Sequence, residues 1–401
     1  MGGHLGATGV GLILSAPSAA TLLLNVPLGR LCDIIGRKPL MWCGTALTAI
    51  GTTATGFVGG SLSTLLACRL IVGAGSASSM TGSSAYISDL SDRAPQHRAK
   101  IMGVHQAIVG SVWIVGPAVG GWLAETYGYQ NSFLIAGFCA MACSVGYTQL
   151  PETLPNRGDS EIRGKNIEIT VNDGKKQQGV NKDSLTVRQH LKSWLNDVKS
   201  ILRSRNQQAL IALACELPIR FSCFTTAVSL HASNVIGAGP KELGMLFTAL
   251  AVSQGIGMPL GSWLADRTAG AKKWMVVPGG LVSSVFFASL AFATSLEQFI
   301  AAMAIQGFCG GFYRPAIGAF TAEITSQQIR GQALSLQRQA GSTLSLIGPV
   351  SMGLMADATS CASAILVGSV LMMGCHVSYG VLATGTSKSP QDDISQSKKR
   401  S

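Results

Sequence analysis

The sequence predicts an all-α polytopic membrane protein made of two pseudo-repeated helix bundles. Of its 401 residues, 47% are hydrophobic and only 12% are charged, whereas a soluble protein is about a quarter charged. Its apolar stretches have the roughly 20-residue length that crosses the hydrocarbon core of a bilayer. Its 48 glycines suit close helix packing in lipid. Finally, residues of the first half recur at a nearly constant spacing in the second half.

Eleven apolar segments are predicted to be transmembrane helices. Five lie in the first half, at 8–28, 40–58, 64–87, 99–123 and 132–150. Six lie in the second half, at 208–230, 243–264, 274–293, 296–320, 333–355 and 362–382.

The two halves repeat with a spacing that is the same, to within one position, for every matched pair. Asp33 corresponds to Asp266, and Arg98, Gly116-Pro117 and Glu125 correspond to Arg330, Gly348-Pro349 and Asp357. Parallel repeats of this kind indicate two related bundles. The segment at 208–230 has no counterpart before residue 8. We therefore expect a twelve-helix fold whose first helix is missing from this chain; a true eleven-helix protein is the alternative.

This pattern divides the chain into four parts. Residues 1–151 form an N-terminal bundle of five helices, and residues 207–384 form a C-terminal bundle of six. Between them, residues 152–206 form a basic linker with an amphipathic segment that is expected to lie on anionic lipid, or else to be a solvated helix. Residues 385–401 form a polar tail.

Basic residues predict the orientation. If the loop containing Asp33 is cytoplasmic, the cytoplasmic loops, linker and tail hold 25 of the 30 Lys and Arg residues. The opposite side then holds only Lys241. This asymmetry follows the positive-inside rule, and it explains the net charge of +11 without a nucleic acid partner. The ten cysteines have no metal-ligand spacing, and no phosphate loop or nucleophile motif indicates an enzyme.

Several motifs resemble those of the major facilitator superfamily. Gly29-x-Leu31-x-Asp33-x-x-Gly36-Arg37-Lys38 is similar to the signature loop between its second and third helices, except at Ile34, where a basic residue is usual. Arg69-x-x-x-Gly73-x-Gly75 is similar to its fourth-helix motif, and Leu150-Pro151-Glu152-Thr153-Leu154 resembles its drug:proton antiporter branch. The resemblance implies two six-helix bundles that rock about a central substrate site.

The signature loop is predicted to act in gating. Gly29 and Gly36 allow a tight turn and close helix approach, and Asp33 is expected to pair with Arg93 or Arg98. Plain topology anchoring by Arg37 and Lys38 is the alternative. Asp266 and Arg267 form the degenerate second copy.

Glycines in the fourth predicted segment resemble the helix-five motif of proton-coupled antiporters. They are Gly103, Gly116, Gly120 and Gly121, with Pro117. The resemblance implies that this cluster seals against leak; packing alone also explains it.

Charged residues inside the membrane mark candidate pathways because they are costly there. Glu216 and Arg220 are four residues apart and share a helix face. Glu216 is the candidate proton-carrying group; a static ion pair with Arg220 is the alternative. Arg69 and Arg314 are predicted to face a cavity. Five polar or aromatic residues are further candidates for the pathway, and ordinary interhelical contacts are the alternative for each. They are His105, Gln106, Trp113, Gln254 and Tyr313.

Together these features predict a secondary transporter that exports a small organic molecule in exchange for protons. The alternatives are an organic anion or metabolite carrier and a transporter-like sensor or scaffold that carries nothing. No cofactor or metal is expected beyond the proton gradient. The chain is expected to be a monomeric integral membrane protein, by default in the plasma membrane.

Overall fold

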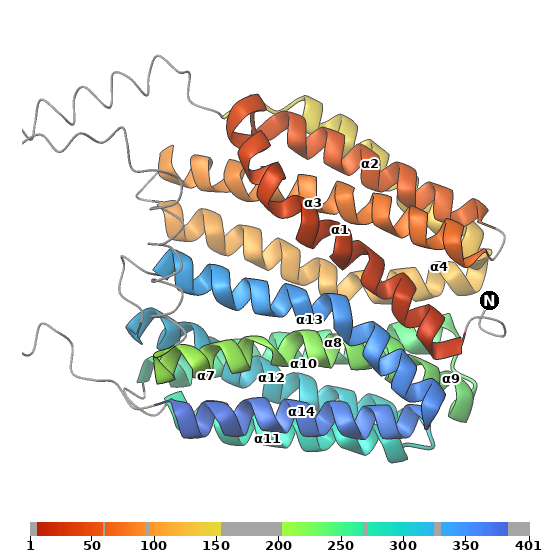
Figure 1. Ribbon diagram of the computed structural model, residues 1–401, viewed down its shortest axis with the longest axis vertical. Coiled ribbons are helices and arrows are strands. Elements are labelled where there is room, and N and C mark those ends of the chain that lie inside the picture. The colour runs from red at the N-terminus through yellow and green to blue at the C-terminus, as the bar shows by residue number, and fades with distance from the viewer. Residues whose placement is uncertain are drawn as a thin grey trace, which may run out of the picture.

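The computed structural model describes residues 6–58, 61–93, 97–153, 203–267, 272–324 and 330–383. Long helices run side by side along one direction (Figure 1), and these residues contain no strand. The amphipathic part of the linker and the polar tail lie outside the described residues.

The N-terminal bundle contains α1 (Gly6–Ile35), α2 (Arg37–Phe57), α3 (Leu62–Arg93) and α4 (Arg98–Thr148). α4 covers two predicted segments, 99–123 and 132–150. It is interrupted at Gly128, whose φ of 78° and ψ of 164° are not helical. A positive φ suits glycine because it lacks a Cβ. The five predicted segments of this half are therefore helical in the described residues.

The C-terminal bundle begins with one interrupted crossing. It consists of α7 (Arg205–Ala214), α8 (Glu216–Cys223), the π-helix η2 (Phe224–Val228) and α9 (Ser229–Ile236). Gly237 ends α9 in the left-handed conformation, with φ of 65°, a common helix terminator. π-helical turns are rare and often occur at functional sites.

Five further α-helices complete this bundle. They are α10 (Pro240–Arg267), α11 (Lys272–Ser289) with the short 3₁₀ helix η3 (Leu290–Phe292), α12 (Leu296–Ile324), α13 (Arg330–Ala358) and α14 (Cys361–Leu382). Apolar side chains from these helices and from η2, including Phe224, Phe287, Phe299 and Met303, form a buried core.

All eleven predicted segments are helical, but their hydropathy differs. Among the described residues, seven helical stretches are long and apolar enough to cross a membrane. They are Gly6–Asn25, Leu62–Arg93, Ile108–Thr148, Arg205–Ile236, Pro240–Ala265, Trp274–Phe292 and Cys361–Leu382. The fold is that of an integral multi-pass membrane protein.

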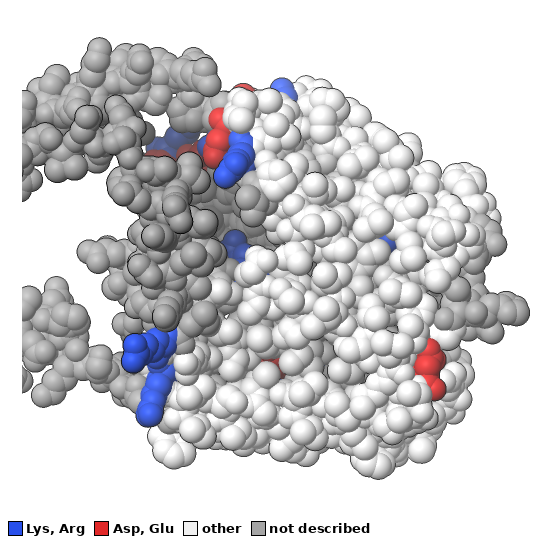
Figure 2. All heavy atoms as spheres, viewed as in Figure 1, with Lys and Arg blue, Asp and Glu red and all other residues white. Residues whose placement is uncertain are grey.

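The two bundles meet along two pairs of helices. α1 packs against α13, and α4 packs against α10. Figure 1 shows α1 and α13 close together at the end marked N and diverging toward the other end. The chain alternates direction, so Arg37, Arg93, Arg205 and Arg267 all lie at that other end, which we call the basic end. In Figure 2, charged atoms gather toward this end and one acidic patch lies near the opposite end, while the surface between is almost uncharged.

Candidate functional site

The predicted signature loop is almost entirely helical. α1 continues to Ile35 and α2 begins at Arg37, so Gly36 alone makes the turn. Gly36 has φ of 106°, and its N–H donates to the Cys32 carbonyl oxygen at 3.2 Å. A Cβ at this position would lie 2.5 Å from Glu152 Oε2. Both the conformation and the space therefore require glycine.

Glu152 caps the helix that follows this turn. Its two carboxylate oxygens accept hydrogen bonds from the backbone N–H groups of Arg37 and Lys38, each at 3.0 Å. A carboxylate satisfies the free N–H groups of a helix start and complements its dipole. Glu152 follows the end of α4, so its motif ties the last helix of the N-terminal bundle to the start of α2.

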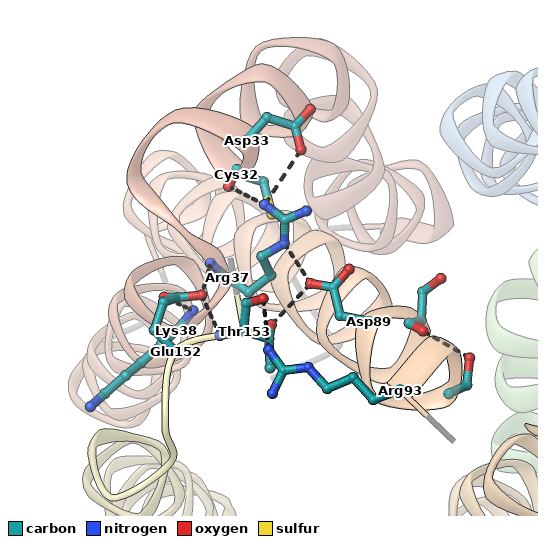
Figure 3. A network of polar contacts seen from close by, with 10 residues as sticks. Cys32, Asp33, Arg37, Lys38, Asp89, Arg93, Glu152 and Thr153 are labelled. Atoms are coloured by element: carbon teal, nitrogen blue, oxygen red, sulfur yellow. Dashed lines mark hydrogen bonds and ion pairs between the residues drawn. The ribbon is translucent and has the colours of Figure 1, made fainter. Parts of the chain in front are cut away.

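The Arg37 side chain links three elements at the basic end. Figure 3 shows its guanidinium between Asp33 on α1 and Asp89 on α3. Its Nε donates to Asp89 Oδ2 at 2.9 Å, and the same oxygen accepts from Thr153 Oγ1 at 3.0 Å. Asp33 lies farther away, at 3.6 Å, and its side chain is 75% exposed against 23% for Asp89. The ion pair with Asp89 is therefore the tighter of the two.

The predicted pairing of Asp33 with Arg93 or Arg98 stays a prediction, and its described ion pair is with Arg37. Arg93 donates to the Thr153 carbonyl oxygen at 3.1 Å rather than to Asp33, because the end of α3 faces the segment after α4. The side chains of Arg98 and Asp266 lie outside the description. Arg267 stacks its guanidinium on the Trp263 ring at 4.3 Å. The described contacts of Arg37, Asp89 and Glu152 thus join parts of one bundle. A Cβ at Gly29 would meet nothing within 4 Å.

A second polar cluster lies inside the C-terminal bundle. Arg220 Nε donates to Glu216 Oε1 at 2.6 Å, confirming that the two residues share a helix face. Arg220 also donates to Ser283 Oγ of α11 at 2.8 Å and to Gln306 Oε1 of α12. Tyr313 Oη lies 3.5 Å from the same guanidinium. These contacts bring α8, α11 and α12 together around one buried charge.

This cluster is closed off from solvent. Glu216 is 3% exposed and Arg220 5% exposed, while Gln306 and Tyr313 are fully buried. The Tyr313 ring packs edge-on against His376 of α14. A buried charge is tolerated when it is paired and hydrogen-bonded. This environment favours the static ion pair over proton carriage, which stays a prediction.

The helix-five motif divides into two sets of residues. Gly121 faces α10, where a Cβ would lie 2.5 Å from the Pro240 carbonyl oxygen. The Pro117 carbonyl oxygen lies 2.6 Å from the Cβ position of Gly244. By contrast, a Cβ at Gly116 or Gly120 would meet nothing within 4 Å. Pro117 and Gly121 therefore pack the two bundles together, whereas Gly116 and Gly120 do not. The surroundings of Gly103 are outside the described part of the structure.

The remaining candidates have fewer described contacts. The Arg69 guanidinium lies over the Phe133 ring at 5.3 Å, and its buried Nε has no hydrogen-bond partner within the described part of the chain. His105, Gln254 and Arg314 are partly exposed. The side chains of Gln106 and Trp113 are outside the description. Asp89 and Ser283 were not predicted as site residues from the sequence. The feature that could have indicated Asp89 is its position as a carboxylate at the end of an apolar helix, one turn before Arg93.

Comparison with known proteins identifies the family. A family model described as Major Facilitator Superfamily matches residues 1–231 and 210–400. The chain belongs to this superfamily. Membership confirms the predicted superfamily, the multi-pass helical class and the exclusion of an enzyme.

Curated relatives match part of the chain. Multidrug resistance protein 1 of Bacillus subtilis (strain 168) is 28% identical over 162 residues, which is 40% of this chain and 41% of that protein. Quinolone resistance protein NorA of Staphylococcus aureus (strain Mu50 / ATCC 700699) is 32% identical over 136 residues, or 33% and 34% of the two chains. The matched stretch thus spans less than half of each relative.

Solved structures match nearly the whole chain. A bacterial homolog to the human lysosomal transporter Spinster, in an inward-facing and unoccupied conformation, has a TM-score of 0.68 at 17% identity, covering 94% of this chain and 88% of that one. The human organic anion transporter MFSD10 (TETRAN) has a TM-score of 0.56 at 17% identity, with coverage of 92% and 83%. These likenesses show the fold.

Proposed function

We propose that this member of the superfamily is a secondary active transporter that exports a small organic molecule by alternating access, driven by a proton gradient. The observation that carries the proposal is the unequal contact between the bundles in the described part of the chain, where α1 and α13 diverge toward the basic end (Figure 1). Close backbone contacts join α1 to α13 and α4 to α10 near the end opposite the basic end. Two rigid bundles held at one end are suited to rocking about a central site.

The polar networks support the rigidity of each bundle. Arg37, Asp89 and Glu152 tie together α1, α2, α3 and the segment after α4. Arg220 ties α8 to α11 and α12. Because these contacts lie within bundles, they can persist while the bundles move relative to each other.

The names of the relatives support the substrate class. Two of them are named for multidrug and quinolone resistance, and this suggests organic drugs as the first substrates to test. An organic anion is the second candidate, favoured by Arg69, whose buried Nε has no described partner.

Transport is tested on the full chain in proteoliposomes. A quinolone and an organic anion dye are assayed separately, with an imposed pH gradient and without it. Movement of the quinolone that stops when the gradient is collapsed supports proton-coupled export. Gradient-independent exchange of the anion supports the carrier instead. No flux of either probe in protein-containing liposomes contradicts transport of both classes.

Asp33→Asn sharpens this test. The variant is expected to remain in the membrane but to lose transport. Among the described residues Asp33 makes one long, exposed ion pair, so its carboxylate is available for contacts in another conformation. Normal flux through the variant would remove Asp33 from the gating mechanism. Arg205→Gln, an exposed basic residue at the same end, is the control for lost surface charge.

A further inference from the structure

Asp357 makes a polar contact between the two bundles. It lies near the end of α13, and its Oδ1 accepts a hydrogen bond from the Ala7 N–H at 2.8 Å. Its Oδ2 accepts from the Thr8 N–H at 2.8 Å and from Thr8 Oγ1 at 2.6 Å. A C-terminal-bundle carboxylate thus caps the first helix of the N-terminal bundle, where free N–H groups and the helix dipole favour negative charge.

The backbones beside this cap are packed without room for side chains. A Cβ at Gly353 would overlap the Ala7 carbonyl oxygen, and a Cβ at Gly11 would overlap the Pro349 carbonyl oxygen. A Cβ at Gly6 would lie 3.1 Å from Asp357 Oδ2. The cap is therefore the polar end of a close helix–helix contact rather than an isolated surface bond.

The other pair of helices repeats this contact. At the spacing that relates the two halves of the sequence, Gly244 is the counterpart of Gly11, and Gly353 is the counterpart of Gly121. Each of these glycines faces a carbonyl oxygen of the opposite bundle. The residues that carry those oxygens correspond in the same way, because Pro349 is the counterpart of Pro117 and Pro240 that of Ala7. The repeat seen in the sequence is thus a pair of matching contacts in space.

The carboxylates at the two contacts differ. Glu125 is the repeat counterpart of Asp357. At α10, however, the Gly239 N–H already donates to Glu242 Oε2 at 2.9 Å. Glu125 Oε2 lies 3.4 Å from the Cβ position of Gly239, beside a second carboxylate. Only the α1–α13 contact carries a cap between bundles among the described residues.

We propose that Asp357 is a gate residue, whose carboxylate holds α1 against α13 and keeps the end opposite the basic end closed. Opening that end separates the two helices and breaks three hydrogen bonds together. Asp357 is thus a positioning residue for the conformational change. The inference rests on the alternating-access proposal, but its test measures a distance and needs no substrate.

The test measures distances between spin labels on the full chain, carried on introduced noncanonical amino acids at positions 57 and 292. These exposed positions end α2 and follow α11, so the pair spans the two bundles at the end opposite the basic end. Losing a helix cap typically changes an equilibrium by about fivefold. Asp357→Ala, which removes both acceptor oxygens, is therefore expected to raise the ratio of long to short distances by about fivefold, and Asp357→Glu is expected to restore part of the short population.

Two further variants make the result decisive. Thr8→Val removes one donor from the other side of the contact and is expected to shift the distances in the same direction by a smaller factor. Glu125→Ala, the matched counterpart in the repeat, is expected to leave them unchanged. An unchanged distribution in Asp357→Ala, or an equal shift in Glu125→Ala, would overturn the assignment. Because no substrate is present, neither result depends on whether the chain transports.

Discussion

The two ends of the molecule hold the bundles in different ways. At the end opposite the basic end, glycines and Asp357 bring α1 onto α13 and α4 onto α10 across the bundle interface. At the basic end, Arg37, Asp89 and Glu152 connect parts of the N-terminal bundle to one another. The first set of contacts must break when the bundles move apart, whereas the second set can survive the movement.

This difference separates residues that define a conformation from residues that stiffen a bundle. Asp33 contributes only weakly to the second group in this conformation, since its described ion-pair partner, Arg37, lies 3.6 Å away and its side chain is mostly exposed. It is therefore the residue most available for a contact that forms only when the basic end closes. Four variants or conditions test this separation, from the largest expected effect to the smallest.

The comparison of the two ends assumes that the C-terminal bundle is rigid. The largest effect, a loss of stability, is expected from Glu216→Gln. The substitution leaves Arg220 buried without its counter-charge, which typically costs about 3–5 kcal/mol. The melting temperature of the purified chain in detergent measures the loss. Adding Arg220→Met removes the unpaired charge and is expected to recover most of the stability. A single variant as stable as the parent would contradict a structural role for the pair.

A smaller effect is expected from Gly353→Ala at the closed end. The new methyl group overlaps the Ala7 carbonyl oxygen, and overpacking of this kind costs about 1–3 kcal/mol. The 57–292 label distance is expected to lengthen while the chain stays folded. Gly374→Ala is the matched control, because a Cβ there meets nothing within 4 Å. Equal behaviour of the two variants would show that the glycine contact does not hold this end.

At the basic end, Asp89→Asn is expected to have an effect of about 1 kcal/mol, because the Arg37–Asp89 pair is only partly buried. The loss should appear in thermal stability and leave the 57–292 distance unchanged, since the pair lies within one bundle. Asp33→Asn is expected to change stability less, given its longer and more exposed contact. A lengthened 57–292 distance in Asp89→Asn would break the distinction between the ends.

The smallest effect is expected from pH. Hydrogen bonds from the Thr8 hydroxyl and from the N–H groups of Thr8 and Ala7 lower the pKa of Asp357. Because the pKa is lowered, the ionised carboxylate stabilises the α1–α13 contact fully above the ordinary Asp pKa of about 3.9. This stabilisation is lost only as the pH falls through the lowered pKa. Its titratable neighbour among the described residues is the Cys361 thiol. The 57–292 distance is therefore expected to be the same at about pH 7.5 and about pH 5.5; a change over that range would assign proton sensing to this contact.

The sequence predicted the fold well because membrane helices are set by apolar length and by repeats. It predicted the Glu216–Arg220 pair from their spacing of four residues, and it predicted that Gly36 makes a tight turn. It did not predict that Arg37 pairs with Asp89, because that contact joins α2 to α3 across 52 residues. Nor did it show that Gly121 faces the other bundle while Gly116 faces open space, since only the helix orientation separates them.

The most direct test of the account compares two label pairs on the same protein. Positions 57 and 292 report the end opposite the basic end, and positions 145 and 274, exposed on α4 and α11, report the basic end. Distances are recorded in proteoliposomes with and without a pH gradient and a quinolone. The account predicts that one distance lengthens as the other shortens. Two distances that stay fixed, or that change together, would contradict rocking of two rigid bundles.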